Sequence, residues 1–443
     1  MQRHDPAAVQ RDSVDIHQLT QAARILRGQH IRRGQHVQRP QSDVAGGTNG
    51  NPDKIKPRCK PLRLLILPLI ALALAACEPV GMTNLNGVKG PKVDTTKPIP
   101  VALLIPRGGS AADNLLAQEL ENAARLAIRD LAGVQIDLRV YGTGGNAATA
   151  GTTAAQAVTD GAQIILGPLY GEAANAAGNA VAAQGVNVLS FSNNPSIAGG
   201  NVFVLGQNFN DTSNRLVRYA KTNGKDRILV LHGQDLAGQL GRDAILKAIA
   251  ANGATSAGTV DYALSQTAVT AAVPRVKAAI DTNGANAIFL TTSSASALPL
   301  FAELLPEAGI NGATTQYIGL TRWDIPPQTL ALPGVQGGFA LPDPGATSAF
   351  TQRYKAAYGD TPSPVARLAF DGIAAVGALA KSGKSDALSA RRLTQGAGFR
   401  GANGVFRLMS DGTAERGLAV ATIRDKRVVI VSPAPQAFGG AGF

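Results

Sequence analysis

The side chains that most often carry out catalysis are nearly absent from the long C-terminal part of this 443-residue chain. The two cysteines are Cys59 and Cys77, and of the five histidines only His232 lies beyond residue 63. A Cys–His nucleophile, a Cys/His metal site and a disulfide framework are therefore excluded beyond Cys77. The turn at 142–146 is rich in glycine but lacks the lysine of a phosphate-binding loop. We therefore expect a protein that is not an enzyme and uses no cofactor or metal.

Cys77 lies in a context that predicts lipidation. The stretch 54–63 is basic, 64–76 is apolar, and Leu74-Ala75-Ala76-Cys77 resembles a bacterial lipobox. An apolar run of this length is shorter than the ~20 residues of a membrane span and is typical of a signal peptide. We expect 54–76 to be a lipoprotein signal peptide and Cys77 to carry the lipid. The alternative is a buried helix that happens to end in a cysteine.

The segments around this anchor are polar. Residues 1–53 are rich in Arg and Gln without hydrophobic periodicity, and we expect a disordered segment or a leader from a misassigned start. Residues 77–98 read as a flexible tether. Glu78 follows the cysteine where Asp is the usual inner-membrane retention signal of Gram-negative lipoproteins, which implies the periplasmic side of the outer membrane.

The net charge of +12 does not indicate nucleic-acid binding. Residues 1–63 hold 12 basic and 5 acidic side chains, so more than half of the excess lies in the leader. The remainder has no basic block and no basic stripe interleaved with aromatic residues.

Beyond residue 98, apolar runs alternate with segments of helical periodicity. The run 100–105 predicts a strand buried on both faces, and Ser110, three positions before Asp113, predicts a helix start. The alternation recurs and predicts an α/β domain of two doubly wound parallel-sheet lobes. Ligands of such sheets bind at the carboxyl ends of the strands, so we expect a cleft between the lobes and a hinge that couples binding to closure.

We expect the two-lobed domain to cover 99–431. Lobe 1 is expected at about 99–222, lobe 2 at about 227–335, crossovers and the remainder at 336–431, and a tail at 432–443.

Several segments of this domain carry a family resemblance, among them Ile165-Leu166-Gly167-Pro168-Leu169, the helix 350–359 and Gly401-Ala402-Asn403-Gly404-Val405-Phe406. In order and spacing they resemble the leucine/isoleucine/valine-binding protein family, the type I periplasmic binding fold. The resemblance implies a small-molecule ligand held in the cleft and delivered to an ABC importer. Penicillin-binding protein activators carry a similar domain on a lipid anchor.

In the resembled family, first-lobe hydroxyls and backbone N–H groups hold the α-carboxylate of the ligand. The matching positions and the nearby helix start give these candidate ligand-binding residues: Ser110, Tyr170, Gly171, Ser192, Asn193 and Asn194. An ordinary strand–helix turn at Gly171 and an Asn-Pro turn that satisfies its own backbone remain alternatives.

In the second lobe the resemblance adds Ser293, Arg322 and Trp323 as candidates. The family's acid, which holds the ligand's ammonium, falls near Arg322, and Asp324 could replace it only in a shifted register. A basic residue there favours an anionic or glycan-like ligand, or none. Trp323 is either a cleft wall or core, and His232 either lines the cleft or stands uninvolved before a helix.

Two functions follow from these observations. The first is binding of a small amino-acid-like or anionic solute for ABC-type uptake. The second is activation of a peptidoglycan synthase, a penicillin-binding protein, from the outer membrane. Both imply attachment to a membrane through the lipid, and neither involves nucleic acid.

Overall fold

The computed structural model describes residues 90–332 and 336–439. The expected signal peptide, the lipidation site at Cys77 and the leader lie outside the described residues. Within the described part, no helix is long and apolar enough to span a membrane.

The first sheet contains five strands in the order β2-β1-β3-β4-β5, and every neighbouring pair is parallel. The strands are β1 (Ile99–Ile105), β2 (Ile136–Gly142), β3 (Ile164–Leu166), β4 (Asn187–Ser190) and β5 (Val202–Val204). The predicted doubly wound parallel sheet is therefore confirmed for the first lobe.

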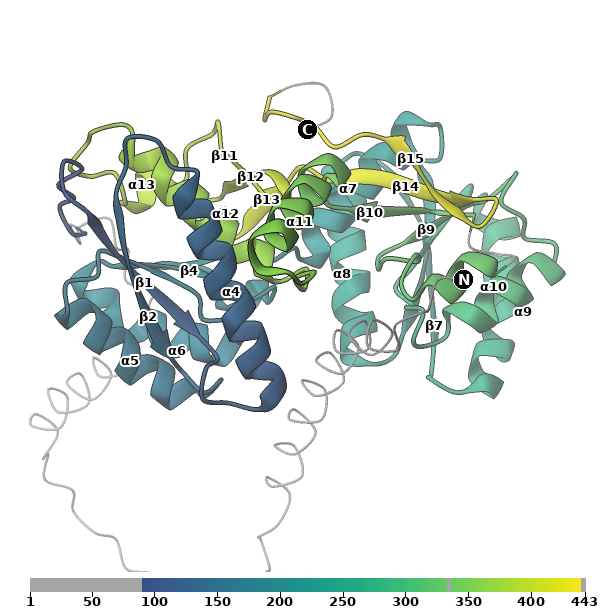
Figure 1. Ribbon diagram of the computed structural model, residues 1–443. Coiled ribbons are helices and arrows are strands. Elements are labelled where there is room, and N and C mark those ends of the chain that lie inside the picture. Colours follow the sequence, from purple (N-terminus) through teal and green to yellow (C-terminus); the bar gives the residue numbers. More distant parts are fainter. Residues whose placement is uncertain (1–89, 333–335, 440–443) are drawn as a thin grey trace, which may run out of the picture. The chain divides into compact units, whose positions relative to one another are not determined.

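Helices cover both faces of this sheet because its strands are apolar on both sides. From β1, Leu103 points into one core and Leu104 into another. The first core also holds the buried faces of α4 (Ala111–Arg129) and α12 (Ala366–Ala380), and the second those of α5 (Ala147–Thr159) and α6 (Gly171–Val181) (Figure 1). A short helix, α13 (Ala390–Leu393), follows α12.

The second sheet has seven strands in the order β15-β14-β10-β9-β8-β6-β7. The parallel strands are β6 (Arg227–Gly233), β7 (Thr255–Tyr262), β8 (Ala287–Leu290), β9 (Gln316–Gly319) and β10 (Gly338–Leu341). Two antiparallel strands, β14 (Ala419–Arg424) and β15 (Arg427–Ser432), extend it. The second lobe thus has the expected parallel sheet, with an antiparallel edge added.

The second sheet is also covered on both faces. One core holds side chains of α9 (Gln266–Asn283) and α10 (Leu298–Glu307), and the other those of α7 (Phe209–Thr222) and α8 (Leu236–Ala251). The sequence placed α7 at the end of lobe 1. Its buried Leu216 and Val217 instead pack with strands of the second sheet, so α7 belongs to the second lobe.

The chain passes between the lobes three times. It leaves β5 for α7 through 205–208, leaves β10 for α11 (Pro344–Tyr358) through 342–343, and leaves β13 (Ala414–Arg416) for β14 through 417–418. Phe350 and Tyr354 of α11 lie in the first-lobe core. The small antiparallel sheet of β11 (Phe399–Gly401), β12 (Gly404–Leu408) and β13 packs on the same core. We refer to 205–208, 342–343 and 417–418 as the three crossovers.

Candidate functional site

Three first-lobe side chains meet after the carboxyl end of β1. Ser110 is the N-cap of α4: its Oγ accepts a hydrogen bond from the Asp113 N–H at 3.2 Å, and Asp113 Oδ2 accepts from the Ser110 N–H at 3.0 Å. Tyr170, after β3, donates its hydroxyl to Asp113 Oδ1. Burial, with this bond to Asp113, raises the pKa of Tyr170 above its usual value. Ser110 and Tyr170 thus share one acid, Asp113, which the sequence identified only as part of a helix start.

A second group forms where α6 begins. A Cβ atom added to Gly171 would lie 3.4 Å from Asn194 Nδ2 and 3.6 Å from Ser192 Oγ. The N-cap of α6, Tyr170, makes no side-chain capping bond. The first N–H groups of this helix therefore lie beside an amide nitrogen and a hydroxyl, which is a favourable place for a carboxylate.

The loop after β4 also satisfies part of its own backbone. Ser192 Oγ accepts from the Asn194 N–H at 3.1 Å, and Asn194 Oδ1 accepts from the Ser196 N–H at 3.0 Å. This is the local turn that the Asn-Pro sequence predicted as an alternative. The Asn194 Nδ2 group remains on the Gly171 side, and Asn193 is exposed. The turn and a contact to a ligand are therefore compatible.

Second-lobe candidates are more fully engaged with the protein. Arg322 binds Asp324 through two bonds, Nε to Oδ1 at 2.9 Å and Nη2 to Oδ2 at 2.6 Å. Ser293 Oγ lies 3.1 Å from Ser296 Oγ. Asp324 is thus already paired with Arg322, so it does not supply the free carboxylate that binds the ligand's ammonium group in the resembled family.

Trp323 and His232 are both buried. Trp323 is 1% exposed and lies in the α9/α10-side core of the second lobe, where an added Cβ on Gly319 would come within 2.4 Å of its ring. Of the two roles that the sequence allowed for Trp323, cleft wall or core residue, the structure shows the core residue. His232 is 5% exposed, and its Nδ1 lies 3.0 Å from the Gly233 carbonyl oxygen.

The family of the chain follows from comparison with known proteins. The model of the periplasmic binding protein family matches residues 98–427. The chain belongs to the periplasmic binding protein family. No curated protein matches the sequence.

Solved structures share the fold at low identity. A Rhodospirillum rubrum protein described as a branched-chain amino acid ABC transporter has a TM-score of 0.63 at 18% identity, with 76% of this chain and 100% of that chain covered. A Desulfitobacterium hafniense ABC transporter substrate-binding protein in complex with Leu has a TM-score of 0.55 at 18% identity (76% and 100% covered). A Rhodopseudomonas palustris solute binding protein in complex with 3,4-dihydroxybenzoic acid has a TM-score of 0.51 at 18% identity (78% and 99% covered). The periplasmic binding fold predicted from the sequence is thereby confirmed.

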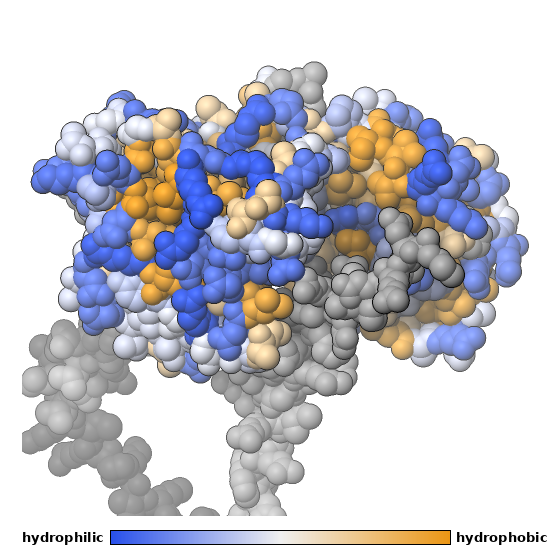
Figure 2. Space-filling view, in the orientation of Figure 1, coloured by the Kyte–Doolittle hydropathy of each residue, from blue (hydrophilic) through white to orange (hydrophobic). Residues whose placement is uncertain are grey.

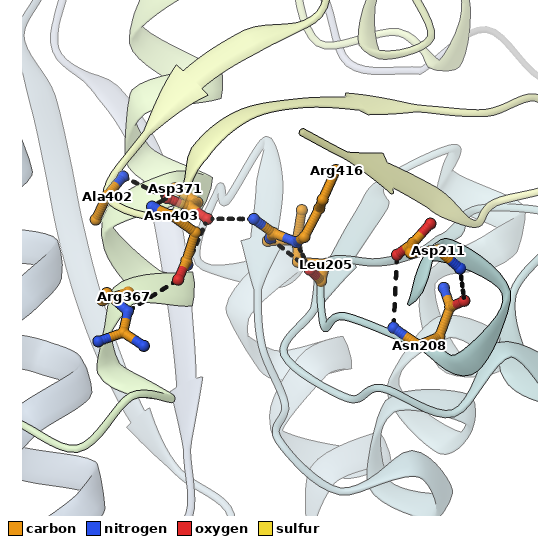
Figure 3. A network of polar contacts seen from close by, with 8 residues as sticks. All are labelled: Leu205, Asn208, Asp211, Arg367, Asp371, Ala402, Asn403 and Arg416. Atoms are coloured by element: carbon orange, nitrogen blue, oxygen red, sulfur yellow. Dashed lines mark hydrogen bonds and ion pairs between the residues drawn. The ribbon is translucent and has the colours of Figure 1, made fainter. Parts of the chain in front are cut away.

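In this periplasmic binding protein, a buried polar network joins two crossovers (Figure 3). Asp371 of α12 is fully buried and accepts hydrogen bonds from the Ala402 N–H at 2.7 Å and Asn403 Nδ2 at 3.0 Å. Arg416, which is 5% exposed, approaches the same carboxylate through Nη1 at 2.9 Å. Its Nε donates to the carbonyl oxygen of Leu205 at 2.9 Å. Arg416, the last residue of β13 before the third crossover, therefore connects that end of the strand to the first crossover and to α12.

Asp211 lies close to this network (Figure 3). It closes the capping box of α7 with Asn208, whose Oδ1 accepts from the Asp211 N–H at 3.1 Å. Burial raises the pKa of Asp211 to about 8, although the positive charge of Arg416 acts in the opposite direction. The sequence signal for these residues was weak because Asp371 and Arg416 are far apart along the chain.

Among the described residues, no group of His, Cys, Asp and Glu side chains could hold a metal ion.

Proposed function

We propose that this periplasmic binding protein is a non-catalytic carrier that binds a small carboxylate-bearing solute for ABC-type uptake. The observation that carries the proposal is the grouping of Gly171, Ser192 and Asn194 at the start of α6. Backbone N–H groups at a helix start, beside a hydroxyl and an amide, suit a carboxylate. The structural relatives in complex with Leu and with 3,4-dihydroxybenzoic acid support this ligand class.

The acids of the second lobe favour an anionic solute over an α-amino acid. After β6, Asp235 caps α8; near the end of β7, Asp261 binds Arg275; after β9, Asp324 binds Arg322. An ammonium group would have to displace one of these partners, whereas a carboxylic acid without an amino group needs no such acid. We therefore rank aromatic or aliphatic carboxylic acids above amino acids.

Calorimetric titration of the protein with leucine, benzoate and 3,4-dihydroxybenzoate tests the proposal. We expect saturable heat with a carboxylate, and a loss of at least ~10-fold in affinity when Ser192 and Asn194 are both replaced by alanine. The reason is that each hydrogen bond to a charged group contributes about 1.5–3 kcal/mol. Ser196→Ala is the matched control, because this exposed hydroxyl lies in the same loop. Absence of heat with every small solute would contradict the proposal.

A second candidate function, activation of a peptidoglycan synthase, has its own support in four exposed leucines. Leu115, Leu236, Leu240 and Leu264 are each more than half exposed and follow the carboxyl ends of β1, β6 and β7. Exposed leucines at the ends of both lobes suit docking of a protein partner. Affinity capture from solubilised envelopes separates the two functions: a cell-wall synthase supports activation, and an importer's permease supports solute uptake.

We also propose that the chain is periplasmic and attached to the outer membrane through a lipid on Cys77. The basic, apolar and lipobox-like segments in 54–77, followed by Glu78, support this location.

A further inference from the structure

The last strand of the second sheet, β15, forms an open edge of that sheet. Among the described strands it pairs with β14 alone, in the yellow hairpin of Figure 1. Its sequence, Arg-Val-Val-Ile-Val-Ser, is apolar and β-branched at the four central positions. Val428 and Ile430 are 38% and 39% exposed, so the strand presents apolar side chains to water. An exposed apolar edge of this kind is a template for pairing with a further strand.

The hairpin turn determines which backbone groups of β15 face outward. Residues 425–426 join the two strands with φ angles of 50° and 58°, which are those of a type I′ turn. The pair that flanks such a turn, Arg424 and Arg427, exchanges hydrogen bonds, and bonded and non-bonded pairs alternate along the ladder. The N–H and C=O groups of residues 428 and 430 therefore point away from β14, toward the open edge.

Two copies of this edge complement each other when they pair antiparallel about a twofold axis at Val429. Residue 428 of each copy then lies opposite residue 430 of the other, and their outward N–H and C=O groups can form ladder hydrogen bonds. The same register places the exposed Val428 side chain of one copy beside the exposed Ile430 side chain of the other. The apolar side chains that each single chain exposes thus cover one another.

The charges at the hairpin turn favour this register. Pairing about Val429 places Arg427 opposite Val431 of the other copy. The two Arg427 residues are then about 13 Å apart along the ladder, which exceeds the Debye length of about 8 Å at physiological ionic strength. A register centred on Arg427 would instead bring two like charges directly opposite each other, which is destabilising.

We propose that β15 is an interaction surface for a second copy of this chain, and that antiparallel pairing of the two β15 strands joins two second sheets into one. An interface of one strand pair is smaller than the about 1,200–2,000 Å² that is typical of stable complexes, so the dimer is weak and depends on concentration. The pairing requires no bound solute, so it goes beyond the proposed function and does not rest on it.

Cysteine cross-linking of the full chain in cells treated with an oxidant tests the register. Val429 lies on the twofold axis in a non-hydrogen-bonded pair, whose Cα atoms are about 4.5 Å apart, and a disulfide can span this distance. We expect Val429→Cys to form a disulfide-linked dimer on a non-reducing gel, with a yield at least ~5-fold above the wild type. The wild type supplies the background from Cys59 and Cys77.

Val428→Cys is the matched control. Residue 428 is more exposed than residue 429, so random collisions would cross-link it more readily. In the proposed register, however, the two 428 Cα atoms are more than about 7 Å apart, which is too far for a disulfide. We therefore expect this variant to stay at the wild-type level.

Ile430→Lys, combined with Val429→Cys, tests whether the apolar edge drives the pairing. A lysine on an edge strand opposes pairing with another strand, so the cross-linked fraction should fall at least ~5-fold. Ile430 is exposed, and its replacement should leave the fold intact. Three results would overturn the inference: no dimer in Val429→Cys, an equal yield in Val428→Cys, or a disulfide that mass spectrometry assigns to a different protein.

Discussion

Asp371 and Arg416 form the most completely buried ion pair among the described residues. A buried pair is tolerated only where further hydrogen bonds satisfy both groups, because removing either charge from water is costly. Here the Ala402 N–H and Asn403 complete the carboxylate, and the Leu205 carbonyl completes the guanidinium. Through its bond to the Leu205 carbonyl oxygen, Arg416 thus fixes the relative position of two segments that are more than 200 residues apart in the sequence.

Asp211 makes the stability of the protein depend on pH. Its folded-state pKa of about 8 lies above the ordinary value of 3.8, so the folded state binds a proton that the unfolded state releases. The free energy of unfolding should therefore fall as the pH rises from about 4 to about 8, by up to ~1.4 kcal/mol per pH unit. Asp211→Asn should flatten this dependence, measured by urea unfolding at pH 5.5 and 8.5.

The charges near Asp211 are Arg416 and Glu415, and both remain in this variant. Asp243→Asn, at an exposed acid of α8, is the control and should keep the wild-type dependence. An Asp211→Asn protein with the wild-type pH dependence would show that Asp211 is ionised in the fold.

At the scale of the element, α5 and α6 pack closely because both present small residues. Ala150, Ala154 and Ala157 are buried on α5, and Ala173, Ala174, Ala177 and Gly178 are buried on α6. Side chains of this size let two helices approach each other and the sheet beneath them. The abundance of Ala and Gly in the sequence therefore serves the covering layer of the first lobe.

Two glycines of these helices should respond oppositely to alanine. A Cβ on Gly178 would lie 2.2 Å from Val202 Cγ2, whereas a Cβ on Gly151 meets nothing closer than the Ala176 carbonyl oxygen at 3.4 Å. We expect Gly178→Ala to lower the free energy of unfolding by about 1–3 kcal/mol through overpacking. Gly151→Ala should raise it by about 0.5–1 kcal/mol, since alanine favours the helix. Denaturant unfolding of both variants checks this, and equal effects would contradict the packing of α6 on β5.

At the scale of the whole molecule, three crossovers join two lobes that each have helices on both faces of their sheet (Figure 1). The surface alternates polar and apolar regions on the face shown in Figure 2. The exposed leucines at the strand ends belong to both lobes. The affinity of a protein partner that contacts leucines of both lobes would therefore depend on how the lobes are arranged.

The attachment to the membrane that we propose is a matter of the whole chain and would depend on Cys77. Acyl chains bind a bilayer by about 0.8 kcal/mol per buried CH₂. We expect the protein from cells to partition into the detergent phase of Triton X-114, and Cys77→Ala to move it to the aqueous phase. Cys59→Ala, in the basic segment before the apolar run, should behave as the wild type. Mass spectrometry that finds residues 54–76 retained would contradict the anchor.

The alternation of apolar runs and helical periodicity determined the fold class, most strand positions and the start of α4 at Ser110. These features are local, because a strand buried on both faces and a capping box are each determined by a few residues that are close together in the sequence. The loops after β3 and β4 could also be found in this way, since parallel strands place their carboxyl ends at one edge.

Only the tertiary structure showed that α7 packs in the second lobe, that Trp323 belongs to the core, and that Arg322 pairs with Asp324. It alone brought Arg416 to Asp371 and Leu205. The physical reason is that these contacts join segments that are distant in sequence. The sequence around a charged residue does not indicate whether folding leaves that residue in water or buries it beside a partner.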